Sequence, residues 1–331
     1  KWEKEGLVPR PSDTLQERLY CIRWRKPNGD RVYRAPTEFD LRNEAKVLKL
    51  LQERLENWWE KGFIPSAALP VGGEKTEEPI RTRGWTHWHH LFTPRQLLLN
   101  GVFAEFVESG DGQRLLPLRG RLANLNSRLC RWLPTQGGGI GGGKDTFDNM
   151  ALNTLYNFSC RPFRAVESSV MSWPKSSPCS GHSVFVDDAS EIRASNDLWI
   201  TDPPYADAIN YHELSDFFLG QYAAAIDNHF LDWTPDGRKA LAVRGSGEDF
   251  KQSMVEVYTN LTNHMPDNGL QMVMFTHQDP SVWADLGMIL WAAGLRVTAA
   301  WTVATETPAG GIKKGNYVQG TVLLVLRKRM E

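Results

Sequence analysis

The stretch Leu198-Trp199-Ile200-Thr201-Asp202-Pro203-Pro204-Tyr205 decides the fold expected for this chain of 331 residues. Its first half is an apolar run typical of a strand, and the two prolines then bar a helix and keep the backbone extended. The stretch therefore predicts a carboxylate, Asp202, and an aromatic ring, Tyr205, just past the carboxyl end of a strand. Open α/β sheets bind their ligands at that end, so we expect a site here.

Apolar runs and helical periodicities alternate around this stretch. Strands are expected at 183–186, 198–201, 270–275, 297–303 and 321–326, and helices at 211–226, 250–264 and 280–293. This alternation predicts an α/β fold with a mostly parallel sheet. Only a loop-like segment separates the last two strands, so these two are expected to pair antiparallel.

The first 144 residues show helices and loops instead of this alternation. A hairpin is expected around Pro27-Asn28-Gly29, and helices are expected from Thr37, from Thr93 and over 115–132. The Pro/Gly-rich residues 62–82 indicate a linker. We therefore expect a domain boundary near residue 144.

Composition excludes several classes of protein. The net charge is −1 and hydrophobic residues make up 41%, which indicates a folded core and no global basic field. The four cysteines form no CxxC pair, so neither a zinc knuckle nor a thiol redox site is predicted. The sequence shows no apolar run long enough for a membrane span and no secretory signal, so we expect a cytoplasmic protein without a membrane partner.

Positive charge is concentrated locally. Between Arg81 and Arg131 there are eight arginines against three acidic residues, an excess of five. Tryptophans lie among these arginines, and rings beside cations are typical of nucleic-acid contact through stacking and phosphate pairing. The candidate nucleic-acid contacts, which include two lysines of a later loop, are Arg81, Arg83, Trp85, Trp88, Arg95, Lys313 and Lys314.

Two other patterns resemble ligand sites but lack the required context. The glycine-rich residues 137–143 match phosphate-loop patterns, yet no apolar strand precedes them, so a flexible linker is the better interpretation. His87, His89 and His90 are crowded together, but they lack the spacing that puts two ligands on one helix face. No metal site is predicted.

The tetrapeptide 202–205 suits one kind of chemistry. A heterocyclic amine is a poor nucleophile because its lone pair is delocalised into the ring, and hydrogen-bond acceptors on the amine localise that pair. Asp202 supplies a carboxylate, Pro203 a backbone carbonyl, and Tyr205 a flat face on which an extruded base can stack. The alternative is structural: a proline-rich turn after a strand, with Asp202 as a cap.

Asp202-Pro203-Pro204-Tyr205 resembles the catalytic motif of S-adenosylmethionine-dependent methyltransferases that act on exocyclic amino groups of nucleobases. Asp187-Asp188-Ala189-Ser190 resembles the segment whose carboxylate contacts the adenine of the cofactor. Further segments resemble, in the same order, the large adenine-specific DNA methylases that carry a zinc ribbon: 91–96, 128–133, 146–153, 206–218, 273–278 and 294–308.

The resemblance implies a fold, an activity and a site. The fold is a Rossmann-like methyltransferase sheet in residues 145–331, with a helical and loop region in residues 1–144 that contacts DNA and recognises the target. The activity is methylation of adenine in double-stranded DNA, in a restriction–modification or phage-defence system. The catalytic residues are Asp202, Pro203, Pro204 and Tyr205, and the contacts to S-adenosylmethionine are Asp188, Ala189 and Asp202.

The sequence departs from that family in two features. The glycine-rich cofactor loop that follows the family's first strand is missing, as are the cysteine pairs of a zinc ribbon. We therefore expect an incomplete sheet whose partner is the N-terminal half of a longer protein or another defence-system subunit. Methylation of a cytosine amine or of RNA, and a non-catalytic DNA-binding subunit, remain open alternatives.

Overall fold

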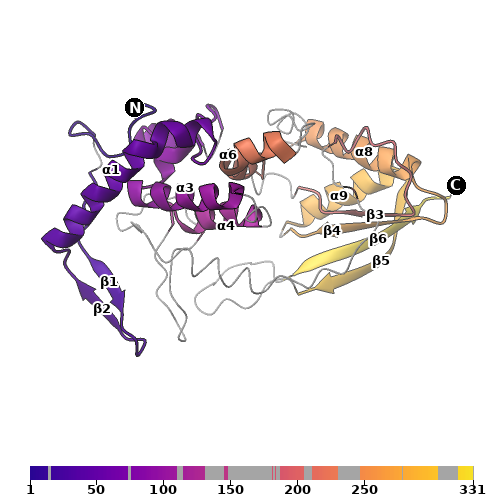
Figure 1. The fold of residues 1–331 in the computed structure, drawn as a ribbon. Coiled ribbons are helices and arrows are strands. Elements are labelled where there is room, and N and C mark those ends of the chain that lie inside the picture. Colours follow the sequence, from indigo (N-terminus) through magenta and orange to yellow (C-terminus); the bar gives the residue numbers. More distant parts are fainter. Residues whose placement is uncertain are drawn as a thin grey trace. The chain divides into compact units, whose positions relative to one another are not determined.

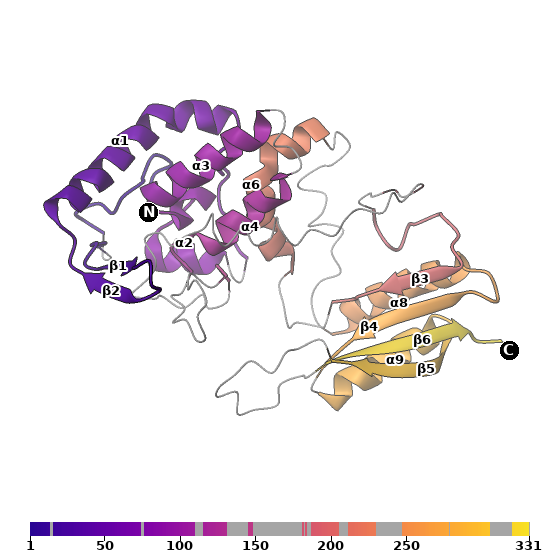
Figure 2. The same cartoon turned by 60° about the horizontal axis from the view of Figure 1, so that its bottom comes forward.

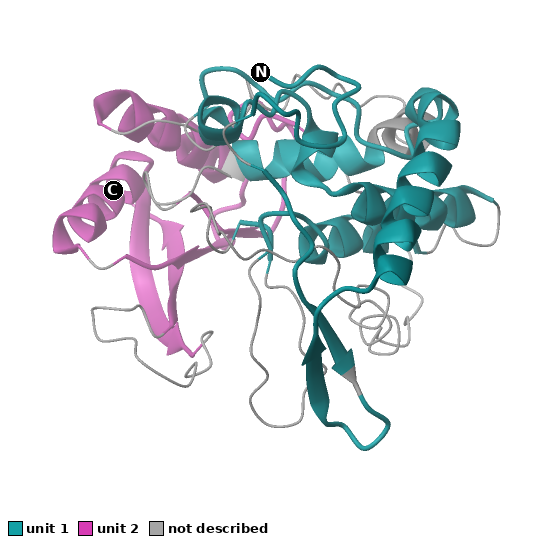
Figure 3. Ribbon diagram, turned by 90° about the vertical axis from the view of Figure 1, so that its left-hand side faces the viewer, with its two compact units in different colours: residues 1–181, 213–233 teal, residues 182–212, 234–331 magenta. Residues whose placement is uncertain are grey.

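Two compact units divide the chain in the computed structural model, which describes residues 1–13, 16–73, 76–109, 115–130, 145–147, 181, 183, 187–204, 211–229, 247–277, 279–304 and 320–330. The first unit comprises residues 1–181 and 213–233, and the second comprises 182–212 and 234–331 (Figure 3). Most of the helix that follows the Asp-Pro-Pro-Tyr motif therefore belongs to the first unit.

The first unit contains a β-hairpin and a group of helices (Figure 1). Its described elements are β1 (Ile22–Arg25), β2 (Arg31–Arg34), α1 (Glu38–Glu60), α2 (Glu77–Arg83), the 3-10 helix η1 (Trp88–Leu91), α3 (Pro94–Glu108), α4 (Pro117–Leu125) and α6 (Tyr211–His229). β1 and β2 pair antiparallel, which confirms the hairpin expected around Pro27-Asn28-Gly29.

Capping side chains set the starts of α1 and α3. Thr37 Oγ1 accepts a hydrogen bond from the Asp40 backbone N–H, and the Asp40 carboxylate accepts one from the Thr37 backbone N–H. Thr93 and Gln96 exchange the same two bonds, and Pro94 begins α3. Each pair satisfies donors that the first turn of a helix leaves unpaired. The helices predicted from Thr37 and Thr93 are confirmed.

Residues 62–82 belong to the core, so the prediction of a linker is wrong. Their buried side chains are Phe63, Ile64, Leu69 and Ile80. The last of these lies on α2, a helix that the sequence analysis did not expect. Glycine serves a turn here: Gly62 has a φ of 64°, a left-handed conformation that favours glycine. Turn residues and buried apolar residues lie close together in this stretch. Its overall proline and glycine content therefore indicated a linker, although individual side chains are part of the core.

The helix predicted over 115–132 is shorter than expected. α4 ends at Leu125, and Asn126, Ser127 and Arg128 follow it as buried residues. The Asn126 amide donates to Asn100 Oδ1 at 3.2 Å, and Ser127 Oγ lies 2.9 Å from Thr146 Oγ1. These tertiary hydrogen bonds satisfy polar groups that would otherwise lose water on burial, and they replace a further helical turn.

The second unit is built on a four-stranded sheet with the order β3-β4-β6-β5 (Figure 2). The strands are β3 (Leu198–Thr201), β4 (Leu270–Phe275), β5 (Leu295–Val303) and β6 (Thr321–Lys328). β3 and β4 are parallel, whereas β6 pairs antiparallel with both β4 and β5. The antiparallel pairing of the last two strands is confirmed. The mostly parallel sheet is wrong for the described strands, because β6 lies between β4 and β5; the strand expected at 183–186 lies largely outside the described residues.

Helices α8 (Glu248–Asn263) and α9 (Pro280–Ala292) cover one face of this sheet (Figures 1 and 2). Their apolar side chains share a core with alternate residues of β4, among them Val273 and Phe275. Leu198 and Ile200 of β3 are exposed, although parallel strands are usually covered on both faces. No helix in the described parts of the chain is both long and apolar enough to cross a membrane.

Candidate active site

The carboxyl ends of β3 and β4 lie side by side in the second unit. The two strands are parallel and in register, with Thr201 opposite Val273. Asp202 follows Thr201 immediately and is exposed, whereas Pro203 is buried and Pro204 is half-buried. The proline pair thus ends the strand and leaves the carboxylate at the edge of the sheet, where it is open to solvent. Tyr205 lies outside the described residues.

A tyrosine of α8 holds the last residue of β3. The Tyr258 hydroxyl lies 3.1 Å from Thr201 Oγ1 and the side chain is buried. Burial raises the pKa of Tyr258 to about 12, and the negative charge of the nearby Asp202 carboxylate adds to the rise. Tyr258 therefore remains protonated over the physiological range and keeps a neutral hydrogen-bonding group behind Asp202.

The turn that contains Asp188 is also tied to α8. Asp188 Oδ1 accepts hydrogen bonds from the Ser190 backbone N–H at 2.8 Å and from Ser190 Oγ at 2.6 Å. The Asn260 amide donates to the carbonyl oxygens of Ala189 and Ile192, at 3.1 and 3.0 Å. One carboxylate oxygen of Asp188 therefore stabilises its own turn. Its other oxygen makes no hydrogen bond to the described residues.

Tyr258 and Asn260 are the residues near this edge that the sequence analysis missed. Both lie on α8, two positions apart, and together they fix the end of β3 and the turn 188–192. Tyr258 continues an apolar helix face with Met254 and Leu261, so its spacing indicates packing only. The pairing of each residue with a segment more than 50 positions away becomes visible only in the tertiary structure.

His277 follows β4 at the same edge of the sheet. Its Nδ1 accepts a hydrogen bond from the Asp279 backbone N–H at 3.0 Å, and its carbonyl oxygen accepts one from Trp283 Nε1 at 3.0 Å. These bonds connect the end of β4 to the start of α9. His277 is thus a structural residue in the described part of the chain.

The tryptophans proposed as nucleic-acid contacts lie in the core of the first unit. Trp85 is 6% exposed and Trp88 is 3% exposed. Trp88 packs edge-on against Phe217 of α6, with ring centroids 5.7 Å apart. A ring must be open to solvent to stack on a base. The prediction of a stacking surface at Trp85 and Trp88 is therefore wrong, because both rings are buried in the core of the first unit and are not accessible to a base.

Four described arginines of the same segment, Arg83, Arg95, Arg119 and Arg128, make contacts inside the protein, whereas Arg81 and Arg121 are exposed. Arg95 Nε donates to Glu44 Oε1 at 2.8 Å, and Arg83 lies over the Trp85 ring at 5.0 Å. Arg119 is buried and bonds the Gly62 carbonyl oxygen at 2.8 Å. Among the arginines proposed to contact nucleic acid, Arg81 is exposed. Lys313 and Lys314 lie outside the described residues.

Arg128 is the most deeply buried of these cations, at 2% exposure. Its Nη1 lies 2.9 Å from Glu17 Oε1, and its Nη2 donates to the Leu7 carbonyl oxygen at 3.2 Å. The guanidinium also lies over the rings of Trp2 and Trp85, at 5.1 and 5.5 Å. Arg128 therefore joins the N-terminal residues to the helices inside the first unit.

Two of the three histidines of the segment, His89 and His90, are buried in the core. The ring nitrogens of His89 lie 3.2 Å from the Pro65 carbonyl oxygen and 2.6 Å from the Lys4 carbonyl oxygen. Burial lowers the pKa of His89 to about 4 and that of His90 to about 3. Among the described residues, no group of three His, Cys, Asp or Glu side chains is arranged to hold a metal ion.

Comparison with protein-family models, with curated proteins and with solved structures found no match for this chain.

Proposed function

We propose that this chain is the catalytic part of a site-specific DNA methyltransferase, which transfers a methyl group from S-adenosylmethionine to the exocyclic amine of adenine. The observation that carries the proposal is the position of Asp202-Pro203-Pro204 at the carboxyl end of a parallel strand, with the carboxylate exposed. α/β sheets bind their ligands at this edge, which favours a binding site over a simple proline turn.

The residues at this edge suit an amine as substrate. The Asp202 carboxylate and the Pro203 carbonyl would accept the hydrogens of the amine and direct its lone pair outward. Tyr205 would stack on the extruded base. Behind them, the Tyr258–Thr201 contact holds the end of the strand in one position. Positioning of this kind matters because small displacements of a reacting group reduce rate strongly.

The described residues fit part of the cofactor site. Asp188 keeps one carboxylate oxygen that no described residue bonds, and Asn260 holds the turn that presents it. Asp188, Ala189 and Asp202 would hold S-adenosylmethionine, which supplies an electrophilic methyl group on its sulfonium. No glycine-rich turn follows a strand among the described residues. A further chain segment or subunit would complete the pocket.

The sheet itself supports a partner of this kind. Among the described strands β3 pairs with β4 alone, and the apolar side chains Leu198 and Ile200 are exposed beside it. Unpaired strand edges and exposed apolar faces are sites where proteins add strands or helices. The N-terminal half of a longer protein, or another defence-system subunit, would extend the sheet past β3.

The test is methyl transfer by the natural full-length protein. Radiolabelled S-adenosylmethionine and duplex DNA should give labelled DNA, and mass spectrometry of the digested nucleosides should identify the methylated adenine. Asp202→Ala should abolish transfer while DNA binding and thermal stability stay near wild type. Asp197→Ala is the matched control, because this exposed aspartate precedes the same strand at its other end.

Each result bears on a named alternative. Methylated cytosine, or transfer to RNA only, would replace adenine in DNA as the substrate. Full activity of Asp202→Ala would disprove the assignment of the site. DNA binding without transfer by the wild-type protein would favour the non-catalytic subunit of a defence complex.

A further inference from the structure

The segment that contains the β1–β2 hairpin carries a strong local excess of positive charge. Residues 18–34 contain six basic side chains and one acidic one, an excess of five, in a protein whose net charge is −1. The rest of the chain therefore carries −6. The basic residues are Arg18, Arg23, Arg25, Lys26, Arg31 and Arg34. A segment with this balance attracts a polyanion even though the whole protein does not.

Aromatic rings are interleaved with these cations and are open to solvent. Tyr20 and Tyr33 are each 60% exposed, and Trp24 is 53% exposed. Among the described residues, no side chain of β1 or β2 belongs to a buried core cluster. Large exposed rings beside exposed cations contribute nothing to the stability of the core, so they indicate a surface for binding.

The hairpin projects from the N-terminal end of α1 as a two-stranded ribbon (Figures 1 and 3). Its ladder pairs Arg23 with Tyr33 and Trp24 with Val32. Directly paired residues share a face of the ribbon and successive residues alternate. Tyr33 therefore points to one face and Trp24 to the other, so each face carries an exposed ring.

The tip of the ribbon is held by its own hydrogen bonds. The Lys26 backbone N–H donates to the Asp30 carbonyl oxygen at 2.8 Å, and the Gly29 N–H donates to the Lys26 carbonyl oxygen at 2.9 Å. Asn28 Nδ2 donates to Asp30 Oδ2 at 2.7 Å. The acidic side chain of Asp30 is therefore hydrogen-bonded within the turn. Gly29 has a φ of 93°, which suits glycine in a tight turn.

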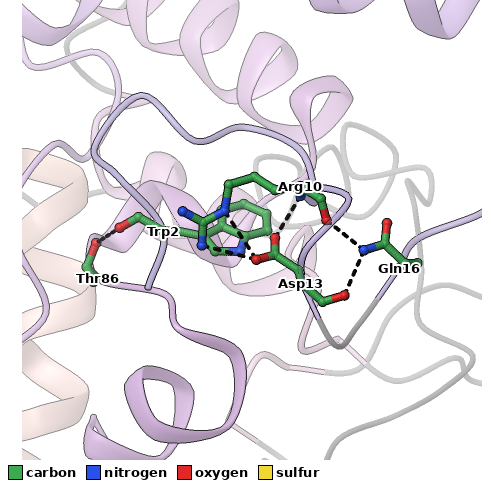
Figure 4. Close-up of polar contacts among 5 residues, drawn as sticks. All are labelled: Trp2, Arg10, Asp13, Gln16 and Thr86. Atoms are coloured by element: carbon green, nitrogen blue, oxygen red, sulfur yellow. Dashed lines mark hydrogen bonds and ion pairs between the residues drawn. The ribbon is translucent and has the colours of Figure 1, made fainter.

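Both ends of the hairpin are anchored to the first unit. Before it, the Asp13 carboxylate accepts bonds from the side chain and backbone of Arg10, and Gln16 Nε2 donates to the carbonyl oxygens of both residues (Figure 4). Glu17 then forms the ion pair with buried Arg128 at 2.9 Å. After the hairpin, the Thr37 capping box begins α1 at once. The segments on both sides of the ribbon are thus held in the first unit, which limits how far the ribbon can move before it binds.

We propose that the β1–β2 hairpin is a duplex-DNA-binding ribbon that enters the major groove. The major groove of B-DNA admits a two-stranded β-ribbon, and its phosphates flank the groove on both sides. Arg18, Arg31, Arg34 and Lys26 are exposed and match those phosphates in charge. The ring on the face that enters the groove, Trp24 or Tyr33, would meet the base edges, and the ring on the opposite face would remain outside the groove. Two hairpins would pair with each other poorly, since their exposed cations would face one another.

This proposal deepens the proposed function, because it names the DNA contact of the same protein. The test measures binding alone, by fluorescence anisotropy with a labelled duplex over a range of salt concentrations, with no cofactor present. The triple variant Arg18→Ala/Arg31→Ala/Arg34→Ala removes three exposed cations. Removal of one cation that pairs with a phosphate should reduce the slope of log K against log salt by about 0.9 and weaken binding roughly fivefold at physiological salt, so three give on the order of 100-fold.

The matched control removes the same charge elsewhere on the first unit. Arg42→Ala/Lys46→Ala/Lys49→Ala takes three exposed cations from α1, whose surface also carries acidic residues such as Glu38 and Glu53. We expect this control to change affinity less than about threefold. Circular dichroism melts should match wild type for both triple variants, because none of the six side chains is buried.

Two results would overturn the proposal. Equal affinities and salt slopes for the hairpin variant and the α1 control would show that the hairpin does not bind DNA. A loss confined to single strands or RNA, about 5- to 150-fold for Trp24→Ala if one base stacks on it, would replace the duplex as ligand. Hairpin-dependent binding without methyl transfer would disprove the proposed enzyme only, whereas transfer with hairpin-independent binding would disprove the ribbon only.

Discussion

Two segments of the first unit share a composition and differ in placement. Residues 18–34 and residues 81–128 are both rich in arginine and aromatic rings. The first segment forms an exposed ribbon with Trp24 at 53% exposure, whereas the second buries Trp88 at 3%. Arginine beside tryptophan is therefore compatible with a core as well as with a surface, and the partners available inside the protein decide between them.

The partners explain the two outcomes. In the buried segment, Phe217 meets the Trp88 ring and Glu17 meets the Arg128 guanidinium. Such partners satisfy both the apolar area and the charge, so burial is favourable. In the hairpin, exposed Arg31 and Arg34 and the exposed rings lie apart from the buried cores. An external partner with phosphates is then the natural complement.

The largest expected effect is loss of stability on replacing the buried arginine. Arg128→Met should lower the free energy of unfolding by about 3–5 kcal/mol, because Glu17 loses its partner and two rings lose a cation between them. Arg34→Met should change it by less than about 0.5 kcal/mol, since that side chain is exposed. Urea titrations of both variants measure the contrast. Equal effects would mean that the two segments do not differ as described.

The second largest effect is expected from acid, which should lower the free energy of unfolding through buried His89 of the segment 81–128. Burial lowers the pKa of His89 to about 4, below its ordinary value of 6.5. Unfolded chains therefore take up the proton more readily, and the contribution of His89 is complete above pH 6.5 and is lost as the pH falls from 6.5 towards 4. At pH 5 the loss is roughly 2 kcal/mol relative to pH 7.

The measurement for the acid effect is urea unfolding at pH 7 and pH 5. His89→Gln is the matched variant, which should be less stable at pH 7 yet lose less between the two pH values. The hairpin contains no histidine, so duplex affinity at pH 6 should stay close to that at pH 7 while the protein is folded. An equal acid sensitivity in wild type and His89→Gln would argue against this buried histidine as the cause.

A small effect is expected at Arg95, whose exposure lies between that of buried Arg128 and that of exposed Arg34. Its guanidinium pairs with Glu44 and its side chain is 36% exposed. Arg95→Ala should cost about 0.2–1 kcal/mol of stability, the usual range for a partly exposed ion pair. Duplex affinity should stay within about twofold of wild type. A salt slope reduced by about 0.9 would instead assign Arg95 to the DNA surface.

Local sequence patterns predicted the individual elements well. Capping residues and periodicity located α1, α3, α6, α8 and α9, and alternation located β3 to β6. They also located the turn of the hairpin and the exposed carboxylate after β3. These features depend on residues close in sequence, since caps, turns and amphipathic faces are satisfied by neighbours.

Predictions that depended on distant partners were less accurate. The linker at 62–82 is core, the helix over 115–132 ends at Leu125, and the strand order puts β6 between β4 and β5. Each of these features involves contacts between residues far apart in the sequence. Composition cannot report such a partner, because it does not say which surfaces meet.

The sequence by itself determined that a strand ends in Asp202-Pro203-Pro204, because proline restricts its own backbone and that of its neighbour. It also determined the charge of the hairpin. Packing of the chain determined that Tyr258 and Asn260 support that strand end and its neighbouring turn. It also determined that the Glu213 carboxylate accepts a hydrogen bond from the Thr76 backbone N–H, 137 residues away in the sequence. Burial and pairing are properties of the packed chain, and they separate a core arginine from one available to DNA.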